Sequence, residues 1–115
     1  MATKTDEKVG KYIQDVKEKI GGEPDVDLLR KVTEYCGPSI FNSDAETVSS
    51  SSESEMETVK KNFLIKKLGL KDDNKLDDGL NAVIEKYGKS NRNKYRAVIY
   101  YLLTQHFKKE SVFKN

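Results

Sequence analysis

The chain has 115 residues, the common length of one domain and too few for two independent ones. Charged residues (35%) and hydrophobic residues (36%) are nearly equal, and the net charge of +2 divides into −6 over residues 1–58, +2 over 59–88 and +6 over 89–115. The longest apolar run has seven residues, too short to span a membrane, and the single cysteine excludes an internal disulfide.

Apolar residues at steps of three and four predict two amphipathic helices in the first third of the chain. The first spans about residues 5–20 and is closed by Gly21 and Gly22. Its apolar face is Val9, Tyr12, Ile13, Val16 and Ile20. The second spans about residues 25–36 and is closed by Gly37. Its apolar face is Leu28, Leu29, Val32, Tyr35 and Cys36.

A serine-rich stretch follows, and we expect residues 43–54 to form a flexible loop. Ser52 and Glu55 have the spacing of a capping box, in which each side chain satisfies a backbone N–H at the start of a helix. This motif predicts a third helix over about residues 53–68. Its apolar positions are Met56, Val59, Phe63, Leu64 and Leu68.

Two further helices are predicted in the last part of the chain. The fourth ends at Gly88, and its apolar stripe is Leu76, Leu80, Val83, Ile84 and Tyr87. The fifth follows Ser90, and its apolar positions are Tyr95, Val98, Ile99, Leu102, Leu103, His106 and Phe107. Ala97, Tyr100 and Tyr101 widen this surface, so we expect the last long helix to be the central one. The sequence therefore predicts an all-α, compact single-domain bundle of about five helices over residues 1–115, with a frayed tail at about 109–115.

Three stretches of the sequence resemble one protein family. They are EPDVDLLRKVTEYCGPSIFNSDAETV, ETVKKNFLIKKLGL and LDDGLNAVIEKYGKSNRNKYRAVIYYLL. They resemble small bacterial proteins grouped as domain-of-unknown-function family 2853, and the resemblance runs from about Val9 to Val112. It implies a compact all-α fold in a bacterial, cytoplasmic protein. It implies no reaction, ligand or catalytic residue.

A basic stretch at the start of the predicted fifth helix is the sharpest functional candidate. It contains Lys89, Arg92, Asn93, Lys94 and Arg96. A recognition helix that reads DNA also offers Arg, Asn and Lys from its first turns, and the amides of a helix N-terminus attract phosphate. The alternative is a solvated basic face that balances the acidic front half. The low net charge and the apolar remainder of this helix favour the alternative.

The single histidine and the single cysteine leave a catalytic pair open. In such a pair the Cys36 thiol is the nucleophile, His106 is the base, and Glu110 orients the imidazole. The alternative is packing, because Cys36 lies at a predicted helix C-terminus, where a thiolate is not stabilised. His106 likewise suits the C-terminal end of a helix dipole. We favour packing and assign no catalytic residue.

The sequence contains no strong motif for a metal site. The acidic residues at the start of the fourth helix are Asp72, Asp73, Asn74, Asp77 and Asp78. They depart from the calcium-loop pattern, because Leu76 stands at a ligand position and Asp77 where glycine is needed, so they are better explained as caps and first-turn carboxylates. One His and one Cys do not make a common zinc site. We expect no metal and no cofactor.

The sequence thus predicts a non-enzymatic interaction or structural domain, with a protein partner or a second copy of itself and no membrane partner. The first alternative is a nucleic-acid-binding domain that uses the basic start of the fifth helix. The second is an enzyme of unknown type that uses His106 and Cys36. Exposure of Arg92, Lys94 and Arg96 on one face favours nucleic-acid binding, and their burial favours the interaction domain.

Overall fold

The computed structural model describes residues 4–21, 23–42, 46–48, 52–71, 73–88 and 94–113. Five α-helices form within them: α1 (Lys4–Lys19), α2 (Val26–Cys36), α4 (Glu53–Val59), α5 (Asn74–Tyr87) and α6 (Arg96–His106). Shorter helical segments are η1 (Gly37–Phe41), η2 (Lys60–Ile65) and η3 (Glu110–Val112). The described ranges contain no β-strand, only an isolated bridge between Thr47 and Tyr95. The predicted all-α fold is confirmed.

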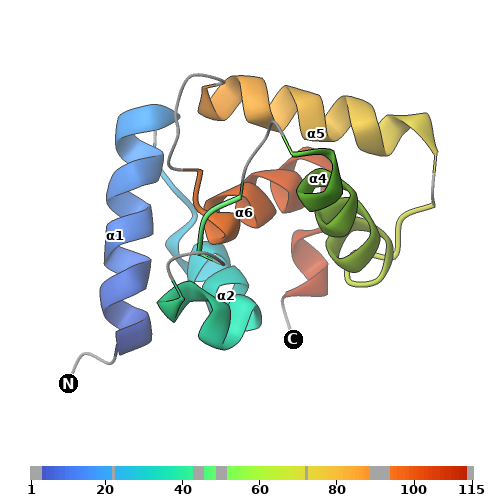
Figure 1. Ribbon diagram of the computed structural model, residues 1–115. Coiled ribbons are helices and arrows are strands. Elements are labelled where there is room, and N and C mark those ends of the chain that lie inside the picture. Colours follow the sequence, from blue (N-terminus) through green and yellow to red (C-terminus); the bar gives the residue numbers. More distant parts are fainter. Residues whose placement is uncertain are drawn as a thin grey trace.

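The α6 helix lies at the centre, with α1, α2, α4 and α5 arranged around it (Figure 1). Every residue from Ala97 to Thr104 is buried, and α2 and α5 make the most extensive contacts with this helix. A helix that is apolar around its circumference must be covered on several sides, so the predicted central position is confirmed. Neither α6 nor another helix of the described ranges is long and apolar enough to cross a membrane.

Side chains cap the starts of α2, α4 and α5, and the caps at Ser52 and Asp73 are among those that the sequence predicts. The Asp25 side chain accepts a hydrogen bond from the Leu28 amide (3.2 Å), and the Ser52 hydroxyl accepts one from the Glu55 amide (3.4 Å). The Asp73 carboxylate accepts one from the backbone amide two residues later (2.9 Å). Each side chain satisfies a donor that the helix itself leaves without an acceptor.

The predicted helix over 53–68 is wrong in one respect. Regular α-helix ends at Val59, and the next six residues form the π-helix η2, with Leu68 N donating to Phe63 O across five residues (2.9 Å). Gly69, at φ +72°, then ends the segment in the left-handed conformation. The wider turns still bury Phe63 and Leu64, so apolar spacing alone does not distinguish this π-helix from an α-helix.

One glycine lets α6 approach α5 closely. A Cβ atom on Gly79 would lie 2.3 Å from the ring of Phe107, the residue that follows α6. Because glycine has no side chain, the ring packs directly on the backbone of α5. This contact fixes the end of the central helix against its neighbour.

Two segments were predicted to be loose. Of residues 43–54, those at 43–45 and 49–51 lie outside the described residues, and between them Val48 N donates to Lys94 O (2.8 Å). Of residues 109–115, those at 110–112 form η3, and Phe113 is buried against the core. Flexibility of the remainder stays a prediction.

Replacement of Leu103 by alanine tests the position of α6. Leu103 is fully buried in the core, so Leu103→Ala should lower the free energy of unfolding by about 2–5 kcal/mol. Val26→Ala is the control, since Val26 is largely exposed and its truncation should change stability by less than about 0.5 kcal/mol. Urea unfolding of both variants makes the measurement, and equal small losses would show that α6 is peripheral.

Candidate functional site

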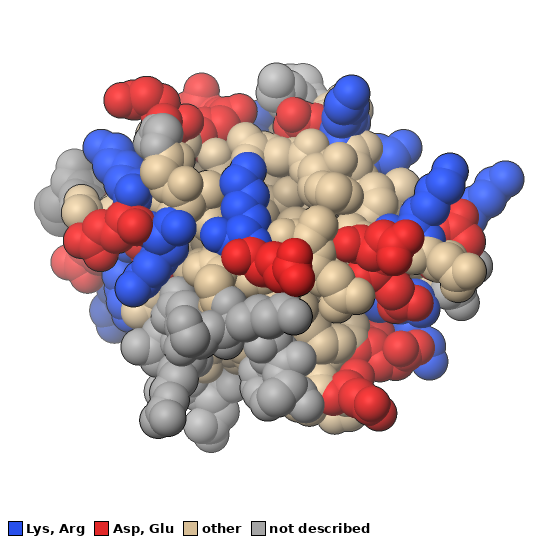
Figure 2. Space-filling model, turned by 90° about the horizontal axis from the view of Figure 1, so that it is seen from above, with Lys and Arg blue, Asp and Glu red and all other residues tan. Residues whose placement is uncertain are grey.

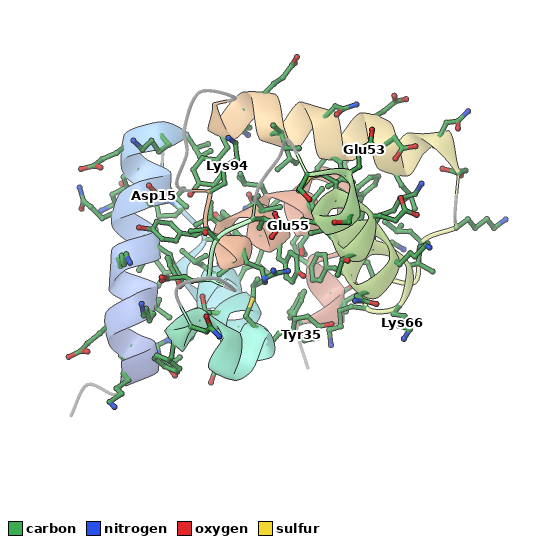
Figure 3. All side chains as sticks on the ribbon, in the orientation of Figure 1. Asp15, Tyr35, Glu53, Glu55, Lys66 and Lys94 are labelled. Carbon is green, nitrogen blue, oxygen red and sulfur yellow. The ribbon has the colours of Figure 1, made fainter. Side chains whose placement is uncertain are left out.

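The basic stretch is only partly described by the structure. Lys89, Arg92 and Asn93 lie outside the described residues, so their role in binding an anion stays a prediction. Lys94 is 3% exposed, and burial lowers the pKa of its ammonium group. Figure 3 places it where α1, the end of α5 and the start of α6 come together. Arg96 is half-buried and donates to the hydroxyl of Tyr100 (3.1 Å). These two cations therefore belong to the packing around the start of α6.

Surface charge is mixed on the face that carries α5. There the described Lys and Arg side chains alternate with Asp and Glu (Figure 2). A nucleic-acid interface gains most of its affinity from a field of one sign. The described part of this face does not form such a field.

A buried carboxylate connects α1 to the start of α6. Glu46 accepts hydrogen bonds from the Tyr12 hydroxyl (2.7 Å) and the Lys8 ammonium (2.9 Å), and the Lys11 ammonium lies 3.4 Å away. The ring of Tyr95 packs 5.0 Å from that of Tyr12, and Lys11 also lies 4.7 Å from the Tyr95 ring centre. We call Glu46, Tyr12, Lys8, Lys11 and Tyr95 the Glu46 cluster.

The charges of this cluster are set by their neighbours. Burial alone would raise the pKa of the Glu46 carboxyl, but the hydrogen bonds from Tyr12 and Lys8 and the charges of Lys11 and Lys8 hold it below its ordinary value. Burial, followed by the hydrogen bond to Glu46, raises the pKa of the Tyr12 hydroxyl. The group therefore holds an ionised carboxylate and a neutral phenol at neutral pH, a stable arrangement with no acid or base ready to react.

A shallow groove of about 440 Å³ lies between α2, the end of η2 and the C-terminal turn. Its lining residues are Lys31, Glu34, Tyr35, Lys67, Val112 and Phe113. Tyr35 is 42% exposed, and Figure 3 shows it between α2 and the C-terminal turn. The Lys67 ammonium lies 5.0 Å from the ring centres of both Tyr35 and Phe113. We call this feature the Tyr35 groove.

Other aromatic rings hold Tyr35 in place. Phe63 and Tyr100 stack in parallel with ring centres 4.1 Å apart. Against this pair Tyr35 packs at 5.8 Å from Phe63 and 6.4 Å from Tyr100, and the Phe113 ring meets it edge-on at 5.8 Å. Such tilted and edge-to-face pairs are favoured by the charge distribution of the rings. The exposed part of Tyr35 is thus presented in one orientation.

Apolar spacing in the sequence places Tyr35 on the apolar face of its helix, but it does not predict this groove. With about 100° between successive residues, Tyr35 lies at the edge of a stripe centred on Val32, next to Lys31. An edge position is half-covered at most unless a neighbouring element extends over it. The elements that extend over Tyr35 are the π-helix and the C-terminal turn. No local sequence pattern predicts that these segments contact it.

The structure does not bring Cys36 and His106 together. Cys36 lies close enough to Arg96 and Tyr100, at the start of α6, for electrostatic coupling. His106 lies ten residues beyond Arg96 and six beyond Tyr100, about 15 Å and about 9 Å along α6, and it packs edge-on against Phe107. Burial raises the pKa of the Cys36 thiol to about 12, and the opposing effect of the Arg96 charge is smaller. The pair that the enzyme alternative needs is therefore not formed.

The acidic residues at the start of α5 serve the helix. Asp73 is its N-cap, and Asp77 pairs with the Lys60 ammonium at 3.4 Å across to η2. Asp72 lies outside the described residues. In the part of the chain that the structure describes, no three His, Cys, Asp or Glu side chains are grouped as metal ligands would be.

The fold and these surfaces define a small all-α domain built around one buried helix. The sequence pattern of a family described as a protein of unknown function, DUF2853, matches residues 11–111. The chain belongs to this family, as the resemblance implied. Among curated proteins, none matches the chain.

The free energy of unfolding should depend on pH through the carboxyl group of Glu46. A carboxyl whose pKa is lowered by folding stabilises the native state above the pKa of the unfolded chain, about 4.3, and this contribution is lost as the pH falls through the folded value. Glu46→Gln should lower the free energy of unfolding by about 1–2 kcal/mol at pH 7, and the difference from the original chain should vanish towards pH 3. Urea unfolding between these pH values makes the measurement.

One control variant isolates the effect. The pKa of Asp15 shifts in the opposite sense, because burial raises it despite the hydrogen bond from Tyr87, but Asp15 is present in both chains and its contribution cancels. Glu57→Gln removes an exposed pair with Lys61 (3.5 Å) and should cost less than about 1 kcal/mol. A Glu46→Gln difference that is constant from pH 7 to pH 3 would contradict the assigned role of the carboxylate.

The Cys36 thiol, which is partly buried, should be unreactive in the native protein. With its pKa raised to about 12, Cys36 holds almost no thiolate at pH 8. We expect an aromatic disulfide reagent to react at least about a hundredfold more slowly with the native chain than with the chain in urea. Equal rates would revive the enzyme alternative, since they would indicate an accessible and ionised thiol.

Proposed function

We propose that the protein is a non-catalytic interaction domain that binds a partner protein through the Tyr35 groove. The observation that carries the proposal is a large aromatic side chain, 42% exposed, that is held by three other rings and bordered by lysines. The resemblance to small bacterial proteins and the single cysteine support a cytoplasmic, reducing setting.

A fixed aromatic ring is well suited to binding. Side chains such as tyrosine supply a large contact area with few rotatable bonds, and they are enriched among the residues that dominate binding energy. Because Phe63, Tyr100 and Phe113 already orient Tyr35, little conformational entropy remains to be lost when a partner covers the ring. The groove is therefore ready for contact without rearrangement.

The charges around the groove favour an acidic partner segment. Lys31 and Lys67 border it, against one carboxylate, Glu34. The Lys67 ammonium faces two rings and so lies beside the apolar surface. A peptide with a carboxylate next to an aromatic or aliphatic anchor would place the anchor on Tyr35 and the carboxylate near Lys67.

The alternatives have less support. The burial of Lys94 and the contact of Arg96 with Tyr100 remove two cations from the face that a nucleic acid would need. The separation of Cys36 from His106 leaves the enzyme alternative without a nucleophile–base pair. Both observations favour the interaction domain.

Selection of short random peptides displayed on phage tests the proposal. The full chain serves as bait, and Tyr35→Ser serves for counter-selection. We expect enriched peptides to combine an apolar anchor with acidic residues and to bind in the micromolar range by fluorescence anisotropy. Tyr35→Ser should weaken this binding at least about tenfold, as expected of a hot-spot aromatic, and Lys67→Gln should reduce its dependence on salt.

Phe41→Ser is the matched control, because Phe41 is an exposed aromatic (48%) that does not line the groove. It should leave peptide affinity unchanged. Failure to enrich any sequence, or equal loss of affinity in the Tyr35→Ser and Phe41→Ser variants, would refute the groove as the binding surface.

A further inference from the structure

We infer that a second recess, on α5 and α6, binds a small organic carboxylate. It consists of two adjoining hollows of about 210 and 160 Å³ that share Lys86, Leu102 and Gln105. The first hollow also includes His106, and the second extends along the end of α1 to the turn before α2. The ends of α1 and α5 lie side by side at the upper left of Figure 1. This recess shares no residue with the Tyr35 groove, and the inference is independent of that proposal.

Both hollows have a mixed lining in which apolar side chains take part. Leu102 and Val83 contribute them in the first hollow, and Val16, Ile20 and Pro24 in the second. Such a surface suits a hydrocarbon chain or a ring. Drug-sized ligands occupy roughly 300–1,000 Å³, so hollows of this size limit the ligand to a small molecule.

Hydrogen-bond donors gather at one end. Lys86 and His106 stand at the rim with exposed side chains. Among the described residues, no hydrogen bond or ion pair engages the Lys86 ammonium or the ring nitrogens of His106. The ammonium offers positive charge and the imidazole an N–H donor, and a carboxylate complements both.

Gln105 can add a further donor. The Tyr101 hydroxyl accepts hydrogen bonds from the Asp25 amide (2.7 Å) and from Nε2 of Gln105 (3.2 Å). The NH₂ group of Gln105 carries two hydrogens, so one remains for a ligand in the recess that Gln105 lines.

The opposite end sets the orientation of the ligand. Glu23 borders the second hollow, next to the last turn of α1, whose carbonyl groups carry partial negative charge. Both features repel an anion. The carboxylate therefore belongs between Lys86 and His106, and the apolar part of the ligand extends towards Ile20.

The rim is held by packing rather than by the ligand. The ring of Phe107 lies on the backbone of α5 at Gly79 and meets the His106 imidazole edge-on, with ring centres 5.0 Å apart. The imidazole is thereby kept near the first hollow before a ligand arrives. A preformed donor loses less entropy on binding than a mobile one.

Amide NMR spectra of the full chain, titrated with sodium benzoate, test the inference. We expect saturable shifts around Lys86, Gln105 and His106, with a dissociation constant on the order of 1 mM. Benzamide has the same ring without the charge and should bind at least about tenfold more weakly. Inorganic phosphate, which has charge without an apolar part, should also bind more weakly than benzoate.

Three variants make the test specific. Lys86→Gln should weaken benzoate binding about tenfold, whereas Lys75→Gln, an exposed lysine at the other end of α5, should leave it unchanged. Ala82→Leu fills the first hollow from an exposed position and should reduce binding while all charges are kept. Equal affinity for benzoate and benzamide, equal affinity for phosphate, or binding that both Lys86→Gln and Ala82→Leu leave intact would overturn the inference.

Discussion

The structure depends on how the first turn of α6 is fixed. Tyr95, the N-cap residue, makes no side-chain hydrogen bond to the helix that it begins. Neighbouring elements hold this point instead: Val48 N donates to Lys94 O, Thr47 bridges to Tyr95, and Tyr95 N donates to the Tyr87 hydroxyl (3.2 Å). The residue before this short segment is Glu46, whose carboxylate is held by α1.

The Glu46 cluster thus transmits the position of α1 to the central helix. Burying a carboxylate is costly unless its charge is matched and its oxygens are hydrogen-bonded, and Tyr12, Lys8 and Lys11 meet both needs. These contacts hold Glu46 against three side chains of α1 and so attach residues 46–48 to that helix. Lys94 is buried next to this segment, and its carbonyl oxygen accepts the hydrogen bond from Val48 N.

One helix then positions both proposed binding surfaces. With about 100° between residues, Tyr100 and the set formed by Leu102, Gln105 and His106 lie on opposite sides of α6. Tyr100 stacks on Phe63 beneath the Tyr35 groove, and the other set lines the recess on α5. The central helix therefore supports the Tyr35 groove from beneath through the buried Tyr100, and it reaches the surface at the recess through Gln105 and His106.

Local sequence patterns predicted what local physics determines. The caps at Ser52 and Asp73 followed from hydrogen-bonding side chains near helix ends, and the central place of α6 followed from the width of an apolar face. The π-helix did not, because Phe63 and Leu64 satisfy an α-helical period as well as a π-helical turn. The burial of Glu46 and Lys94 arises from partners 34 or more residues away along the chain, as in the bond between Tyr12 and Glu46. A charged residue in a sequence indicates an exposed side chain, but tertiary contacts bury both Glu46 and Lys94.

Exposure alone does not single out Tyr35, because Val26 and Phe41 are about as exposed. Scattered apolar side chains are normal on a protein surface and require no explanation. Tyr35 differs in its surroundings: three rings fix its orientation, Lys67 faces it at 5.0 Å, and it lines a hollow that another molecule can enter. Those rings come from η2, α6 and the C-terminal turn, segments far apart in the sequence. The groove therefore exists only in the folded chain, and the proposed binding through Tyr35 depends on these tertiary contacts.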